Sequence, residues 1–259
     1  MKANFNLIIL MVLLFLFSEL FGLYIGKNFV LYVKSTNPEI SSNSNNILFS
    51  IITFIMILTI FIILILKLKW FKLWIIWLGF ATFIAIVISL SLLVNNEYIA
   101  LIFAILLLLL KLKYNRNIII HNILEILTIT GVVVLIAPLL TINAMLLLLM
   151  IISVYDILSV FYTKHMIYLA EENRKLNFFP GLVATLNGET VILGGGDVGF
   201  VLMFALIVKN MISSLFIVYF ATIGVTTLYI LGKKGKYYPA MPILSLFSTM
   251  GYFLSTFFI

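Results

Sequence analysis

The sequence contains no cysteine and few charged residues. Without cysteine, the chain has no disulfides and no thiolate to act as nucleophile or metal ligand, although this absence does not identify its compartment. Charged residues make up only 10% of the 259 residues, whereas a soluble domain contains about 25%. Apolar runs of about 20 residues recur along the whole chain. The composition therefore predicts an all-α polytopic membrane protein.

The basic residues do not indicate nucleic acid binding, despite a net charge of +7. They lie in short clusters between the apolar runs, as the charges that orient membrane helices do. We therefore expect a membrane lipid environment and no nucleic acid partner.

Nine segments are predicted to span the membrane, the fourth and the seventh being short. They are residues 6–26, 47–66, 73–94, 98–110, 118–137, 141–163, 193–208, 211–231 and 239–259. The first is too long for a signal peptide core and is predicted to be an uncleaved helix. Together they form one membrane domain, residues 1–259, in which a linker at 165–192 separates six helices (1–164) from three (193–259).

The basic residues predict the orientation of these spans. If the N-terminus is cytoplasmic, 13 of the 16 basic residues fall on the cytoplasmic side, and only Lys27, Lys34 and Lys209 fall outside. The linker at 165–192 is then cytoplasmic and the C-terminus lies outside. We expect the protein to be in the plasma membrane.

The only two aspartates, Asp156 and Asp197, both lie in predicted spans. A carboxylate in the middle of a span costs roughly 2.5–3.5 kcal/mol on insertion scales, so such residues usually have a function. At a rise of about 1.5 Å per residue, both lie within roughly 10 Å of the cytoplasmic ends of consecutive antiparallel helices. Two carboxylates that meet in an apolar site share a proton, and such a pair can activate water and protonate a peptide carbonyl. This chemistry requires no metal and no cofactor.

Two short motifs accompany the aspartates. Gly194, Gly195 and Gly196 precede Asp197, and they allow either a substrate backbone or a neighbouring helix to come close. The segment Pro239-Ala240-Met241-Pro242 opens the last span and keeps its backbone irregular near the same membrane face.

In order and spacing, these motifs resemble those of the presenilin and signal peptide peptidase family. Tyr155-Asp156, Gly194-Gly195-Gly196-Asp197 and Pro239-Ala240-Met241 correspond to its Tyr-Asp, Gly-x-Gly-Asp and Pro-Ala-Leu motifs on the sixth, seventh and ninth helices. Met241 replaces the family leucine. The resemblance implies an intramembrane aspartyl protease with Asp156 and Asp197 as catalytic residues. It also implies that Tyr155, the three glycines and Pro239, Ala240 and Met241 contact a transmembrane-helix substrate.

Two further features have more than one interpretation. The segment Thr190-Val191-Ile192-Leu193 is either a strand that pairs with an unwound substrate or the start of the seventh helix. His121 and Glu125 share one face of the fifth helix. They form either a buried pair that holds helices together or a proton relay, because a metal site would need a third ligand.

Two other functions compete with proteolysis. Intramembrane acids also serve in proton- or cation-coupled transporters, although no inverted repeat is found in the sequence. A scaffold could also bind single-span helices without cutting them.

Overall fold

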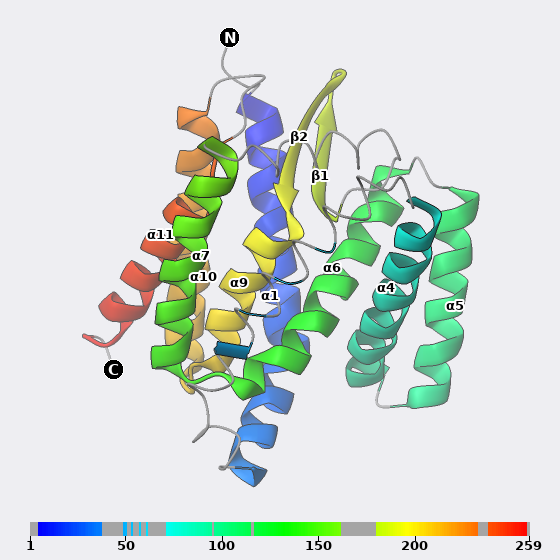
Figure 1. Cartoon of the computed structure of the whole chain (residues 1–259), viewed down its shortest axis with the longest axis horizontal. Coiled ribbons are helices and arrows are strands. Elements are labelled where there is room, and N and C mark those ends of the chain that lie inside the picture. Colours follow the sequence, from blue (N-terminus) through cyan, green and yellow to red (C-terminus); the bar gives the residue numbers. More distant parts are fainter. Residues whose placement is uncertain are drawn as a thin grey trace.

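The computed structural model describes residues 5–37, 71–94, 96–114, 117–161, 180–232 and 238–257, together with the isolated helical positions 49, 50, 53, 57 and 61 (Figure 1). For residues 71–76 and 112, only the backbone is described. The predicted second span, 47–66, therefore lies almost entirely outside the described residues. Residues 165–179 of the predicted linker lie outside them as well.

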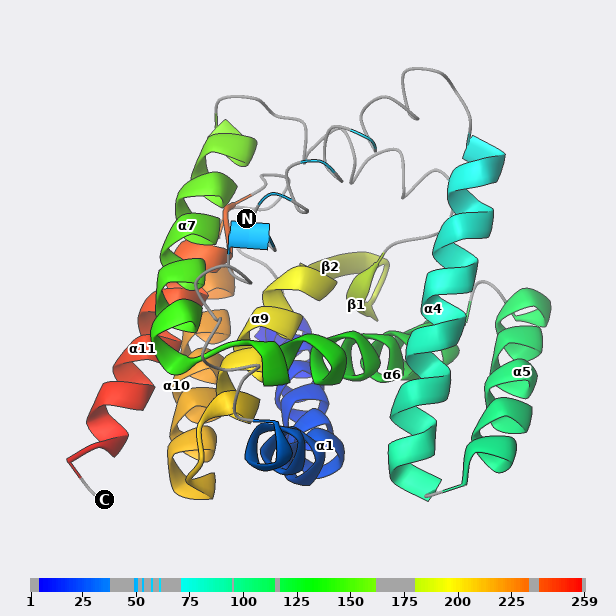
Figure 2. The ribbon, with the colours of Figure 1, turned by 60° about the horizontal axis from the view of Figure 1, so that its bottom comes forward.

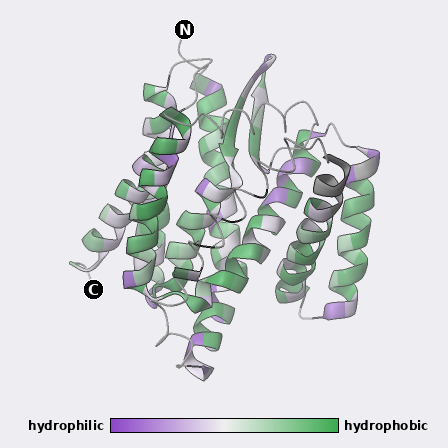
Figure 3. Ribbon diagram, in the orientation of Figure 1, coloured by the Kyte–Doolittle hydropathy of each residue, from purple (hydrophilic) through white to green (hydrophobic). Residues whose placement is uncertain are grey.

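Eight α-helices occur in the described part of the chain. They are α1 (Phe5–Thr36), α4 (Phe71–Val94), α5 (Glu97–Lys113), α6 (Ile118–Ile136), α7 (Ile142–Phe161), α9 (Gly195–Ile207), α10 (Met211–Leu231) and α11 (Met241–Ser255). A short 3₁₀-helix, η1 (Ala137–Leu139), contains Pro138 and joins α6 to α7. Five helical segments are long and apolar enough to cross a membrane, and α9 and α11 are shorter apolar helices. Hydrophobic residues make up most of each helix (Figure 3).

The helix boundaries differ from the prediction at three places. The first helix does not end at Gly26 but continues through Lys27 to Thr36. The seventh predicted span becomes helical only at Gly195. The last helix begins at Met241, so Pro239 and Ala240 precede it rather than form its first turn.

The all-helical prediction is wrong between residues 181 and 194, where the chain forms a β-hairpin. Strands β1 (Gly181–Leu186) and β2 (Glu189–Gly194) pair antiparallel, with Gly181 opposite Gly194. The two-residue turn is Asn187-Gly188, with φ of 52° and 79°, as a type I′ turn requires. Thr190–Leu193 is therefore a strand rather than the start of a helix, and in this structure its partner is β1.

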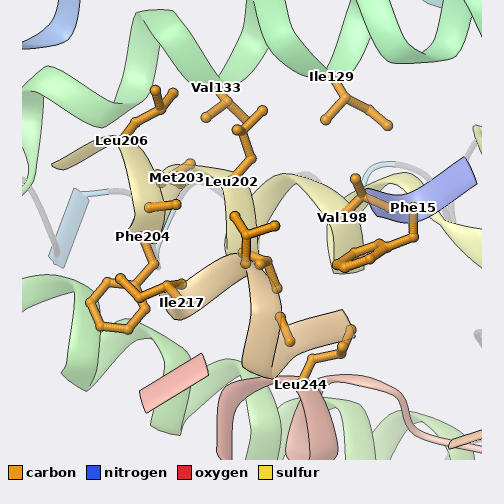
Figure 4. Close-up of a cluster of buried hydrophobic side chains, with 14 of the residues drawn as sticks. Phe15, Ile129, Val133, Val198, Leu202, Met203, Phe204, Leu206, Ile217 and Leu244 are labelled. Atoms are coloured by element: carbon orange, nitrogen blue, oxygen red, sulfur yellow. The ribbon is translucent and has the colours of Figure 1, made fainter. Parts of the chain in front are cut away.

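The short helix α9 lies at the centre of the molecule (Figure 2). Its side chains pack against α1, α6, α10 and α11, and Figure 4 shows Val198, Leu202 and Phe204 among residues from these helices. Helices α4 and α5 lie on the far side of α6 and share a second apolar cluster with it. A helix that is apolar on every side belongs inside a bundle, which is where α9 is found.

Lys27 of α1 holds the C-terminal end of α9. Its side chain is only 6% exposed, although the charge pattern predicts a place outside the membrane. The Lys27 ammonium donates to the carbonyl of Ala205 (3.1 Å), to the carbonyl of Val208 and to the hydroxyl of Ser214 (2.6 Å). The last carbonyls of a helix have no partner within the helix, and a cation there is favourable. Lys27 therefore fixes the depth of α9 relative to α1 and α10.

This contact predicts that Lys27→Met destabilises the protein. The change keeps an apolar stem but leaves the buried Val208 carbonyl without its donor, so we expect the free energy of unfolding to fall by about 1–3 kcal/mol. Thermal unfolding in detergent micelles measures the effect. Lys209→Met is the matched control, because Lys209 is exposed. Equal melting temperatures for the two variants would contradict the role given to Lys27.

Candidate active site

Asp156 is placed by α7 against the first residues of α11. Its Oδ2 accepts a hydrogen bond from the Met241 amide at 3.1 Å, and the backbone of Ala240 also bonds the carboxylate. The first amides of a helix lack partners within the helix, and its dipole favours a negative charge there. Pro242 has no backbone N–H, so the carboxylate accepts from the amides of Ala240 and Met241, the two residues before this proline. The motif Pro239–Pro242 therefore supplies a backbone anchor for Asp156.

Asp197 lies in the first turn of α9, next to its own cap. Gly194 is the N-cap residue, and its backbone hydrogen-bonds the Asp197 carboxylate. A Cβ at Gly194 would lie 2.9 Å from Asp197 Oδ2, which is closer than real Cβ contacts come. Only glycine therefore permits this position of the carboxylate.

The two aspartates face one site although they are 41 positions apart in the sequence. Helix α7 contacts both α9 and α11, and α9 contacts α11. The charge of Asp156 acts on Asp197, so the carboxylates are within electrostatic reach of each other. By accessible area, both residues are intermediate between buried and exposed. The structure thus brings together the two residues that the sequence singled out as a pair.

A serine pair that the sequence analysis missed also joins α7 to α11. The hydroxyls of Ser153 and Ser245 lie 2.6 Å apart, and Ser153 also reaches the Met241 carbonyl at 3.4 Å. Ser153 is one helical turn before Asp156, so this contact holds the Met241 backbone beside the carboxylate. Serine is common in packed membrane helices, and its spacing from Asp156 is the only signal in the sequence.

The residues of α6 hold the hairpin by its β1 edge. The Asn122 side chain donates to the Val183 carbonyl at 2.7 Å and accepts from the Val183 amide at 2.9 Å. His121 Nε2 lies 2.9 Å from the Gly181 carbonyl. The amide of Asn122 thus pairs with β1 as a neighbouring strand would, and this edge is occupied. Figure 1 shows β1 on the side of the hairpin nearest α6.

Glu125 completes this contact from the next turn of α6. It is 3% exposed, its side chain bonds the Gly181 backbone, and its carboxylate lies 3.7 Å from the Lys111 ammonium of α5. The prediction that His121 and Glu125 pair with each other to join helices is therefore corrected. Both side chains bond the backbone of Gly181 in the hairpin. Of the two, only Glu125 also joins α6 to another helix. Within the described residues, no three His, Asp or Glu side chains gather as a metal site would require.

The remaining predicted contact residues have different surroundings. Gly195 donates its amide to the Pro180 carbonyl at 3.0 Å, and a Cβ there would meet the same oxygen at 3.3 Å. Gly196 is exposed, and a Cβ would find only the Phe200 ring, at 3.9 Å. Gly194 and Gly195 thus accommodate groups of this chain itself, whereas Gly196 leaves open space beside Asp197. Tyr155 is half-buried on α7, one residue before Asp156.

Fold and site together define a class of protein: a mostly helical, multi-pass integral membrane protein with two aspartates bonded to backbone at the starts of α9 and α11. The sequence matches the family described as "Signal-peptide peptidase, presenilin aspartyl protease" over residues 11–184, about two thirds of the chain. The chain belongs to this family and is an intramembrane aspartyl protease.

Solved structures have the same fold. The chain is similar to two structures described as a presenilin family intramembrane aspartate protease, one in space group C222 and one in P2. The first has a TM-score of 0.73 and 20% identity, and covers 97% of this chain and 99% of its own. The second has a TM-score of 0.68 and 21% identity, with 96% and 97% covered. No curated protein sequence matches the chain.

The contact between Gly194 and Asp197 predicts that Gly194→Ala impairs activity. The added methyl group would displace the carboxylate, and overpacking of about 1–3 kcal/mol corresponds to a roughly ten- to hundredfold lower rate. Cleavage of a fluorogenic transmembrane peptide measures this loss. Gly79→Ala is the control, because a Cβ there has nothing within 4 Å. If Gly194→Ala cleaved as fast as wild type, the Asp197 carboxylate would not depend on this glycine.

Proposed function

We propose that Asp156 and Asp197 are the catalytic pair, and that they hydrolyse peptide bonds within transmembrane helices of membrane-protein substrates. The observation that carries this proposal is the convergence of the two carboxylates from α7 and α9, each bonded to backbone at the start of a helix. These bonds keep the side chains in place before the substrate arrives, as preorganised catalysis requires.

The reaction needs one protonated and one ionised carboxyl group. The ionised aspartate takes a proton from water, the water oxygen attacks the peptide carbonyl carbon, and the protonated aspartate donates its proton to the carbonyl oxygen. The resulting tetrahedral diol collapses when one hydroxyl gives its proton to the ionised aspartate, the C–N bond breaks and the amine nitrogen receives a proton from the other aspartate. Two neighbouring carboxyl groups titrate as a unit, so the roles of base and acid belong to the pair.

The substrate is proposed to lie as an extended strand beside β2. This strand leads directly into Gly194 and α9, so a segment paired with it would pass Asp197. Pairing through main-chain hydrogen bonds accepts many sequences, which suits a protease of membrane helices. Tyr155, Gly194, Gly195, Gly196, Pro239, Ala240 and Met241 would then surround the cleaved bond, with the open space at Gly196 on the substrate side.

The proposed topology has nine membrane helices, a cytoplasmic N-terminus and an outside C-terminus. The positive charges support it, and in Figure 1 the start of α1 and the hairpin lie toward the top, whereas α11 runs away from them. The aspartates then act near the cytoplasmic face of the plasma membrane. Substrates would be single-span proteins whose N-termini lie outside, by analogy with presenilin.

Removing either charge is expected to abolish cleavage. Asp197→Asn keeps the shape of the side chain but cannot exchange a proton, and general acid–base catalysis contributes about 10²–10⁴-fold to a rate. We therefore expect at least a hundredfold loss for Asp156→Asn and for Asp197→Asn, measured by mass spectrometry of peptide products. Glu97→Gln is the control acid, because Glu97 is exposed at the start of α5. Full activity in either aspartate variant would refute the proposed pair.

The orientation can be tested with single cysteines, since the sequence contains none. Ser35 and Lys113 are both exposed, at the ends of α1 and α5. In intact cells, a membrane-impermeant thiol reagent should label Ser35→Cys, and it should label Lys113→Cys only after the membrane is opened. The reverse pattern would mean that the topology is inverted.

A further inference from the structure

Tyr229, near the end of α10, contacts the hairpin beside the aspartate pair. Its hydroxyl donates a hydrogen bond to the carbonyl of Ile192 at 2.9 Å, and its half-buried ring packs against the main apolar core. The charge of Asp197 also acts on the Tyr229 hydroxyl. Tyr229 therefore joins α10 to β2 at the point where the strand leads to the catalytic helix.

The Ile192 carbonyl lies on the outer edge of β2. Ile192 is opposite Val183 in the ladder, and the amide and carbonyl of Val183 both bond Asn122 instead of β2. Val183 and Ile192 therefore form a non-hydrogen-bonded pair, and the amide and carbonyl of Ile192 point away from β1. The hydroxyls of Thr185 and Thr190, 3.2 Å apart, occupy the next pair of the same kind. A third strand could be added only at this outer edge, since α6 covers the other.

We propose that Tyr229 is a latch whose hydroxyl occupies the Ile192 carbonyl, the acceptor that a substrate amide would use on β2, when the enzyme is empty. A substrate strand beside β2 would donate one of its amides to the Ile192 carbonyl, the acceptor that the Tyr229 hydroxyl uses. A substrate amide must therefore displace this hydroxyl from the carbonyl. The inference rests on the proposed function, because it assumes that the substrate pairs with β2.

The latch acts on substrate binding rather than on the chemical step. To displace the tyrosine hydroxyl, a substrate segment must offer a backbone amide that is at least as good a donor. The amides of an intact helix are already bonded within the helix, so the latch selects segments that have already unwound. The net contribution of one neutral hydrogen bond corresponds to about a two- to tenfold change in an equilibrium constant. Tyr229 is thus a residue that tunes affinity, whereas the catalytic residues remain the two aspartates.

The first test separates KM from kcat in Tyr229→Phe. This change removes the hydroxyl and keeps the ring, so we expect KM for a fluorogenic transmembrane peptide to fall two- to tenfold while kcat changes less than twofold. Tyr219→Phe is the matched control on the same helix, because Tyr219 is 62% exposed, and it should leave both values unchanged. An unchanged or higher KM in Tyr229→Phe would overturn the latch and leave only a structural role.

The second test uses substrates in which one backbone amide at a time is replaced by an ester. At the position that faces Ile192, the ester removes the substrate's donor. In wild type the Tyr229 hydroxyl can keep its bond to the carbonyl, whereas in Tyr229→Phe the carbonyl loses both donors. We therefore expect the KM penalty of this ester to be larger in Tyr229→Phe than in wild type.

The possible outcomes test the latch, the pairing with β2 and the protease function separately. Ester penalties of equal size in the two enzymes would overturn the latch but keep pairing with β2. An absence of any position-specific penalty in either enzyme would refute pairing with β2, and the latch with it. An absence of cleavage by wild type in a broad panel of transmembrane peptides would refute the proposed protease function itself.

Discussion

The burial of α9 on all sides is the constraint on which the rest of the structure depends. A short apolar helix inside a bundle has no solvent at its sides, and each of its ends needs partners from other parts of the chain. Lys27 supplies them at the C-terminal end, and the Pro180 carbonyl, which accepts from the Gly195 amide, does so at the N-terminal end. Since α9 contacts α1, α6, α7, α10 and α11, its position aligns every helix that contributes to the site.

The two acidic side chains are stabilised by backbone amides at the start of helices. Asp156 uses the start of α11 and Asp197 uses the start of α9, so two helix dipoles point toward one site. An arginine or lysine beside each carboxylate would hold it ionised, whereas a pair that must pass protons needs access to both states. Amides favour the charge more weakly than a cation does, which suits the proposed catalytic pair.

Residue types that are rare in membrane spans made the candidate site predictable from the sequence. Asp156, Asp197 and the glycines beside Asp197 stand out in an apolar chain, and most helices follow from their apolar runs. The hairpin was missed because Thr190–Leu193 is too short and apolar to distinguish strand from helix, although Asn187-Gly188 is a strong turn signal. The length of α1 was missed because the carbonyls that bind Lys27 come from residues 178 and 181 positions away. Tyr229 had no signal, since its partner is a backbone atom.

The short length of α9, thirteen residues, has a consequence for how a peptide bond can be hydrolysed inside a membrane. At about 1.5 Å per residue such a helix is roughly 20 Å long, about 10 Å less than the hydrocarbon layer is thick. The hairpin leads directly into α9, and strand edges at membrane depth would face lipid without hydrogen bonds. Those bonds come from the side chains of Asn122, His121 and Tyr229, which take the place of water at the hairpin backbone. The protein thereby keeps polar groups beside its aspartates, and hydrolysis can take place within the hydrocarbon layer.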